Sequence, residues 1–283
     1  TRYYYQSWLV ASDSHALKPA TPMRLRLRLM EFGRGLGFAP QTDVVLKRDF
    51  WLFLREPSQW LHLILMVLLM LVFLVSVGAL ELKLTQPFLQ TVAVLIVFLF
   101  DGFLVASIAL RFVFPSVSLE GDAFWSVRSS PVSLKKLYWQ KLLIAVLLVL
   151  PVSLVLSFTS VSVLRGHSLV VLATVAISGI VALTLTSINL GAGTYFALFR
   201  EKNPIRVASS QGASLTFLGC MIYLSIVVAV LLTPLNNYFR DLIINGRATA
   251  EWMAFPVTVI VLLSFVLILL STGFGLKAFN RDF

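Results

Sequence analysis

The chain has 283 residues, of which 58% are hydrophobic and only 13% charged, and its mean hydropathy is +0.90. Soluble domains are about half apolar and about a quarter charged, so this composition excludes a water-soluble globular domain and predicts a membrane protein. The formal net charge of +10 suggests nucleic acid in a soluble protein. In a membrane protein the placement of positive charge matters more than its sum, so we expect no nucleic-acid partner.

Residues 1–41 are predicted to form a basic cytoplasmic segment. Arg24, Arg26 and Arg28 alternate there with leucines. Near an anionic leaflet such a stretch gains about 1 kcal/mol per charge, although a generic solvated face explains it equally well.

Residues 42–59 are predicted to form an amphipathic helix that lies on the membrane surface. Thr42 suits an N-cap and Pro57 a stop. Apolar and aromatic side chains alternate here with charged ones in the manner of an interfacial helix. The alternative is a helix of a small cytosolic domain.

Residues 60–283 are predicted to cross the membrane six times, because a helix needs about 20 apolar residues to span the hydrocarbon. The apolar runs are continuous, and backbone groups in lipid must be paired within their own segment, so an all-α fold is expected. The predicted spans are Trp60–Gly78, Phe88–Val113, Leu142–Leu164, Ser168–Phe199, Leu215–Thr233 and Ala254–Leu276.

Positive charge is distributed very unequally between the loops of this six-span topology. Only Lys83, Arg165, Arg240 and Arg247 fall on one side, and the other nineteen of the 23 lysines and arginines fall on the opposite side. Cytoplasmic loops carry the excess of positive charge, so both termini are expected in the cytoplasm.

The loop between the second and third spans is dense in charged and aromatic residues. Pro115 ends the preceding span, and Ser118 suits the cap of a short helix to about residue 129. Glu120, Phe124 and Arg128 then fall at i, i+4 and i+8, on one helix face.

Neighbouring residues extend this predicted surface. Gly121 and Trp125 belong to the same short helix, and Pro131 ends it. Ser133 is expected to cap the third span, where Lys141 can meet lipid phosphates. Docking into a soluble partner and simple anchoring of the loop at the interface are both open, since aromatic residues and Arg favour protein interfaces but also suit a membrane surface.

Two polar residues stand out inside the predicted spans, and both are candidates for a substrate path or for packing. Asp101 lies roughly 20 Å into the second span at 1.5 Å per residue, where a carboxylate faces protein or water. A proton relay through Asp101 is the weaker alternative. Asn189 lies in the fourth span among the small-residue pairs Ser187/Gly191 and Gly193/Ala197, which let helices approach closely.

The remaining sequence features indicate no specific chemistry. The single cysteine and the three scattered histidines form no cluster, so no metal site, catalytic residue or enzymatic activity is expected. Residues 234–252 form the one sizeable external segment, for which a helix dipping into the outer leaflet and a surface helix are both open. No Walker-type phosphate loop occurs in the chain.

This layout resembles the permease subunit of type-2 ATP-binding-cassette (ABC) exporters. The residues that carry the resemblance are Leu119-Glu120-Gly121, Phe124-Trp125, Arg128 to Ser133 and Lys141, with the basic lead-in Lys47-Arg48-Asp49 and Arg55 to Trp60. Some permeases of this kind are longer chains with two such halves, and the aromatic start Thr1–Trp8 suggests a C-terminal half.

The resemblance implies a bacterial inner-membrane protein whose loop at residues 119–128 is a coupling helix. Its partners would be a cytosolic ABC ATPase subunit in two copies, a second permease half or identical copy, and lipid. ATP and Mg²⁺ would be bound by the ATPase partner and not by this chain, and the cargo is not specified. The alternative is a multi-pass membrane protein outside the ABC class, such as a secondary carrier or a structural subunit.

Overall fold

The computed structural model describes residues 47–48, 57–79, 86–123, 133–163, 168–201, 203–245 and 251–279. By its internal contacts the chain divides into two units, Thr1–Leu52 and Phe53–Phe283. In the first unit Lys47 and Arg48 are helical. The rest of the predicted interfacial helix and the whole basic segment lie outside the described residues.

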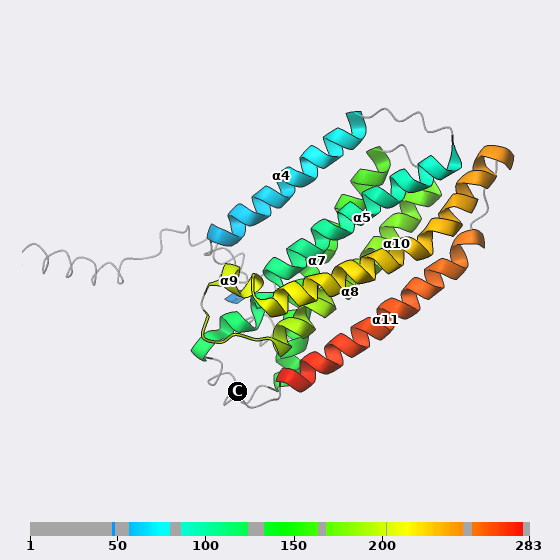
Figure 1. Cartoon of the computed structure of the whole chain (residues 1–283). Coiled ribbons are helices and arrows are strands. Elements are labelled where there is room, and N and C mark those ends of the chain that lie inside the picture. Colours follow the sequence, from blue (N-terminus) through cyan, green and yellow to red (C-terminus); the bar gives the residue numbers. More distant parts are fainter. Residues whose placement is uncertain are drawn as a thin grey trace, which may run out of the picture. The chain divides into compact units, whose positions relative to one another are not determined.

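The second unit is a bundle of long helices (Figure 1). Its elements are α4 (Pro57–Ala79), α5 (Pro87–Phe112), η2 (Phe114–Ser116), η3 (Ser118–Ala123), α7 (Leu134–Val163), α8 (Ser168–Tyr195), α9 (Pro204–Ala208), α10 (Gln211–Asn245) and α11 (Glu251–Phe279). The described residues contain helices and no strand, which confirms the all-α prediction for this part of the chain.

Five of these helices, α5, α7, α8, α10 and α11, are long and apolar enough to cross a membrane. Helix α4 contributes a shorter apolar stretch, Ile64–Ser76. A multi-pass membrane protein is therefore supported, while the sixth span stays a prediction.

Two helices extend beyond the predicted apolar spans. Helix α7 begins at Leu134, eight residues before the apolar span, and the predicted cap is confirmed because the Ser133 hydroxyl accepts a hydrogen bond from Lys136 N at 3.3 Å. Helix α10 continues through Pro234 to Asn245, so the first part of the predicted external segment extends this helix. A proline inside a membrane helix is tolerated where the backbone groups it frees find other partners.

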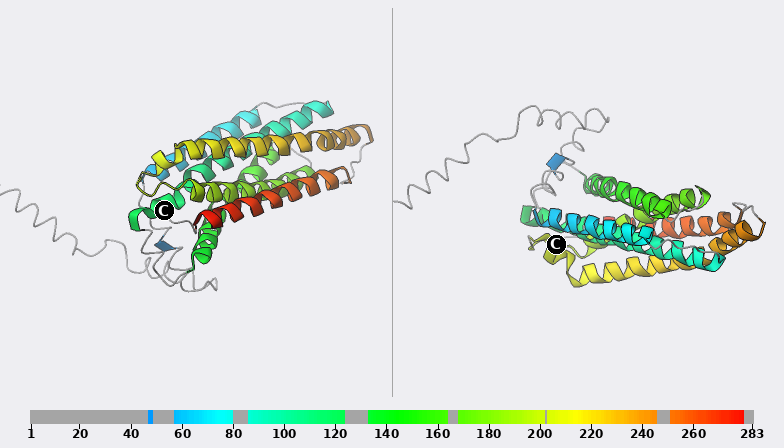
Figure 2. Two further views of the ribbon diagram at one scale, coloured as in Figure 1. Left: turned by 60° about the horizontal axis from the view of Figure 1, so that its bottom comes forward. Right: turned by 90° about the horizontal axis from the view of Figure 1, so that it is seen from above.

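Helix α8 is the centre of the bundle and packs against α5, α7, α10 and α11. Helices α7 and α10 lie on opposite sides of α5, and α4 runs beside α5 (Figure 2). The sequence of α8 suits this position because it carries no charged residue and is rich in small ones. In lipid, helices associate through close packing of small residues and through hydrogen bonds, because there is no hydrophobic force between them.

Candidate functional site

The chain forms a tightly connected corner between α5 and α7. Helix α5 is followed by two 3-10 turns, η2 and η3, and the chain returns in α7. Lys141 of α7 donates to Glu120 Oε1 at 2.6 Å and to the carbonyl oxygen of Ser116 at 3.1 Å. The side chains of Lys141 and Glu120 are only 3% and 11% exposed. The ion pair is therefore nearly buried, and Lys141 does not face lipid phosphates as the sequence suggested.

The same corner is tied to the segment that follows α8. Ser118 is fully buried, and its hydroxyl accepts a hydrogen bond from Leu198 N at 3.0 Å. Gly193 of α8 packs so closely on the backbone carbonyl of Phe114 that a Cβ atom there would clash. Phe114 also joins a buried cluster with Val207 of α9 and Ala213 of α10. We call η2, η3 and these contacts the α5–α7 corner. The corner contacts four of the long helices, α5, α7, α8 and α10.

Gly121 breaks the predicted short helix. Its φ of 60° and ψ of −151° are non-helical and lie in a region that residues with a Cβ atom avoid. The described part of the predicted short helix is therefore two turns that meet at Gly121, while the shared face of Glu120, Phe124 and Arg128 stays a prediction. Phe124, Trp125, Arg128 and Pro131 lie outside the described residues, so their predicted partner contacts stay predictions.

The α5–α7 corner lies at the basic end of the bundle. The rings of Tyr138 and Phe279 are 6.2 Å apart, which places the start of α7 beside the end of α11. The same end therefore gathers the cations of several helix ends and connections: Arg111, Lys135, Lys136, Arg200, Arg206 and Lys277. This clustering agrees with the unequal charge of the predicted loops.

The two candidate residues of the bundle interior do not form one site. Asp101 is 2% exposed and accepts a hydrogen bond at 2.5 Å from the hydroxyl of Ser160 on α7. Asn189 is fully buried, and its amide donates to Leu185 O at 2.8 Å and to Cys220 Sγ at 3.5 Å. Asp101 therefore links α5 to α7, and Asn189 links α8 to α10.

Sequence reasoning missed the serine partners of the interior. Ser153, Ser157 and Ser160 are all buried, and their spacing of three and four residues places them on one face of α7. Ser153 is hydrogen-bonded to Ser178 of α8 at 2.7 Å. A polar stripe at helical spacing inside an apolar run was the signal that could have found them.

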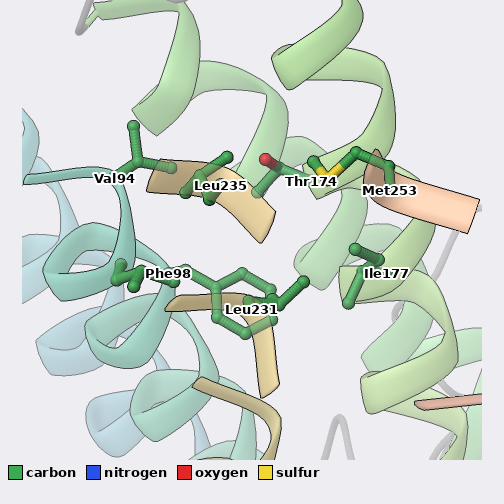
Figure 3. A pocket seen from close by; sticks show the side chains of 8 residues that line it. Val94, Phe98, Thr174, Ile177, Leu231, Leu235 and Met253 are labelled. Atoms are coloured by element: carbon green, nitrogen blue, oxygen red, sulfur yellow. The ribbon is translucent and has the colours of Figure 1, made fainter. Parts of the chain in front are cut away.

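An apolar pocket lies between α5, α8, α10 and α11 (Figure 3). Its lining is Val94, Leu95, Phe98, Thr174, Ile177, Leu231, Leu235 and Met253. The one hydroxyl of this lining, on Thr174, donates to Val170 O of its own helix at 2.7 Å. The pocket therefore presents a surface suited to apolar groups.

The fold and the α5–α7 corner define the class of protein. It is an all-α protein whose membrane-length helices are joined by buried contacts at one basic end. The family described as "Putative ATP-binding cassette" matches residues 1–282, so the chain belongs to that family. Comparison with curated proteins and with solved structures gave no match.

The family match corrects the functional resemblance drawn from the sequence. The matching family is described as an ATP-binding cassette and not as a permease. The identification as the permease subunit of a type-2 exporter is therefore wrong. It rested on the order of spans, one polar loop and the basic lead-in at residues 47–60, and none of these features is diagnostic of a permease. The alternative of a protein outside the ABC class gains no support from this match either.

Proposed function

We propose that this protein anchors an ATP-binding-cassette assembly in a membrane and that the α5–α7 corner is where an ATP-binding partner contacts it. The observation that carries the proposal is the buried Lys141–Glu120 pair, which fixes the turns after α5 to α7. Breaking such a pair leaves a charge buried without compensation, which is strongly unfavourable. The pair therefore opposes separation of the turns after α5 from α7.

The connections of the corner decide what a partner could do there. Lys141 joins η3 to α7, and Ser118 joins it to Leu198 in the segment that follows α8. The cluster around Phe114 joins η2 to α9 and α10. A partner bound here would therefore contact a surface that is joined to several helices of the basic end.

The distribution of charge and the lack of a Walker-type phosphate loop in the sequence support the remaining parts of the proposal. The basic end faces the cytoplasm of a bacterial inner membrane, and the ATP-binding partner is cytosolic and present in two copies. ATP and Mg²⁺ are held by that partner, and this chain performs no chemistry of its own. A second copy or half of the assembly completes the membrane part.

Photoaffinity labelling with an azido derivative of ATP tests the proposal on the full chain purified from its own membrane in mild detergent. We expect a co-purifying polypeptide to be labelled in the presence of Mg²⁺ and this chain to stay unlabelled. Saturable labelling of this chain, competed by ATP, would show that it binds nucleotide itself and would overturn the proposal.

A matched pair of variants tests the corner. Gly121→Ala adds one methyl group where φ is 60°, and Gly273→Ala adds one on α11 where no atom lies within 4 Å. We expect Gly121→Ala to lose most of the labelled partner and Gly273→Ala to keep it. Equal retention by two folded variants contradicts the assignment of the corner.

A further inference from the structure

The apolar pocket between α5, α8, α10 and α11 lies at the depth of lipid acyl chains. Val94 and Phe98 follow the start of α5 by seven and eleven residues, or about 10 and 16 Å. The hydrocarbon core of a bilayer is about 30 Å thick, whereas the 26 residues of α5 are about 39 Å long. The pocket therefore lies inside the hydrocarbon, in the leaflet farther from the basic end of the bundle.

The pocket is a narrow slot that runs along the helices. Its lining forms two tiers that are one helical turn apart (Figure 3), with Val94, Thr174 and Leu235 in the first and Phe98, Ile177 and Leu231 in the second. The four residues from one tier to the next on α5 correspond to about 6 Å, which is room for a few methylene groups. Membrane helices and acyl chains both run across the bilayer, so the slot is aligned with the chains of the surrounding lipid.

The lining does not suit water or a polar ligand. No charged residue is among the eight described residues that line the slot. The hydroxyl of Thr174 already donates to Val170 O of its own helix. A water molecule in a cavity needs two to four polar partners, and a polar ligand needs donors and acceptors placed to orient it. The slot offers neither, so its ligand is an apolar group.

The shape of the slot favours the end of a straight alkyl chain, because its width admits one unbranched chain and no ring system. Seven of the eight described lining residues are buried and Met253 is partly exposed, so the slot opens beside Met253. An unbranched thioether adapts to irregular gaps, so Met253 can yield to an entering chain.

The gain on binding comes from contact and not from a hydrophobic force, because lipid tails are as apolar as the lining. An empty space in a close-packed interior forfeits dispersion contacts on every side, and a chain end that enters the slot restores them. Binding therefore depends on shape, and a chain should compete where a bulky ring does not.

We propose that this pocket binds the end of one acyl chain, which belongs either to a phospholipid of the surrounding leaflet or to a single-chain amphiphile. The chain enters beside Met253 and ends between Phe98, Ile177 and Leu231. Its headgroup stays nearer the surface of the leaflet, since the lining has no group to bind it. This site goes beyond the proposed ATP-binding partner and does not depend on it.

Photolabelling of the full chain in mild detergent tests the site with two probes, palmitic acid and a phosphatidylcholine, each with a diazirine at the end of a palmitoyl chain. We expect crosslinks, mapped by peptide mass spectrometry, to concentrate on the pocket lining. Excess palmitic acid should remove them and excess cholesterol should not. Labelling by the fatty acid alone supports a single-chain amphiphile, and labelling by both probes supports the surrounding lipid as well. Crosslinks spread evenly over the exposed apolar faces, or equal competition by cholesterol, overturn the proposal.

Two matched variants locate the labelling. Ile177→Phe enlarges a side chain of the lining, and Ile222→Phe makes the same change on the exposed face of α10, where Ile222 is 55% exposed. Ile177→Phe should lower crosslinking at the lining about tenfold, because added volume in a packed site excludes the ligand. Ile222→Phe should leave it unchanged, and equal crosslinking in the two folded variants contradicts the site.

A third variant keeps the test decisive if Ile177→Phe fails to fold. Thr174→Val replaces the one hydroxyl of the described lining by a methyl group and keeps the shape of the side chain. Crosslinking by the palmitoyl probes should be retained or rise, because the ligand is apolar. Loss of crosslinking in folded Thr174→Val would show that a polar contact holds the ligand and would overturn the proposal.

Discussion

Lys141 shows how one buried charge organises the α5–α7 corner. Its ammonium group is nearly inaccessible to water and bonds both Glu120 and the carbonyl of Ser116. A buried ion pair as a whole adds little net stability, because desolvation offsets the attraction. Removing one partner alone is different, since the other charge is then left buried and unpaired.

Replacement of Lys141 by Met should therefore destabilise the protein strongly. We expect a loss of about 3–5 kcal/mol, the usual cost of breaking a buried pair from one side. The measurement is the apparent melting temperature of the purified protein in detergent. Adding Glu120→Met to Lys141→Met should restore a large part of the loss, because no charge is then left unpaired.

The control for this experiment is Lys135→Met, which changes an exposed lysine in the first turn of the same helix. Surface ion pairs contribute little, so its melting temperature should match the wild type. A loss as large for Lys135→Met as for Lys141→Met would contradict a special role for the buried pair.

Ser118 makes the second connection of the corner, and its loss should be smaller but measurable. Ser118→Ala leaves the amide of Leu198 without its partner, and because this hydrogen bond is only part-buried, the cost is about 0.5–1.5 kcal/mol, the net contribution of a typical hydrogen bond. Ser116→Ala is the matched comparison, because that hydroxyl donates only to Val113 O of its own turn. Thermal melts of the two variants should differ, with Ser118→Ala lower; the reverse order would rule out the connection to α8.

At the scale of helices, close backbone approach holds α8 and α11 together. A Cβ atom on Gly191 would clash with the carbonyl oxygen of Ser271. One on Gly275 would lie 2.7 Å from the hydroxyl of Tyr138 and 3.0 Å from the Cα of Gly191. Hydrogen bonds between membrane helices, such as Tyr223 to Ser264 at 2.7 Å, average only about 0.6 kcal/mol. Packing at these glycines is therefore the larger effect.

Gly191→Ala should separate α8 from α11 and destabilise the bundle by about 1–3 kcal/mol, the usual cost of overpacking. Gly219→Ala on α10 is the control, since no atom lies within 4 Å of the added methyl group. Because alanine favours a helix over glycine by up to about 1 kcal/mol, this control should be neutral or stabilised. The two variants are compared by thermal unfolding in the same detergent. Equal behaviour would mean that the α8–α11 contact is looser than the structure shows.

The sequence could predict much of this helical architecture but little of the corner. Apolar runs located the long helices, Ser133 was recognised as a cap, and the small residues around Gly191 pointed to close packing. The partner of Lys141 was not predictable, because a lysine at a span end can reach either lipid phosphates or a carboxylate. Gly121 was taken as part of a helix, since a single glycine in a helical pattern is compatible with either a break or a continuation.

For the whole molecule, the distribution of cations predicts which end of the bundle faces the cytoplasm. Cations concentrate at the end where α7 begins and α11 finishes, and in bacteria such an end is retained inside. The opposite end contributes Arg240, which is exposed on α10. These two ends should therefore lie on opposite sides of the membrane.

Single-cysteine labelling tests this orientation with a membrane-impermeant maleimide. The one native thiol, Cys220, is fully buried, so the wild type should react little in its folded state. Lys135→Cys should be labelled only after the cells are lysed. Arg240→Cys should be labelled in unlysed cells whose outer membrane has been made permeable to the reagent. Labelling of both variants in intact cells, or of Lys135→Cys alone, would reverse or refute the assignment. The expected pattern would also place the α5–α7 corner on the side where ATP is available, because Lys135 and Lys141 begin the same helix.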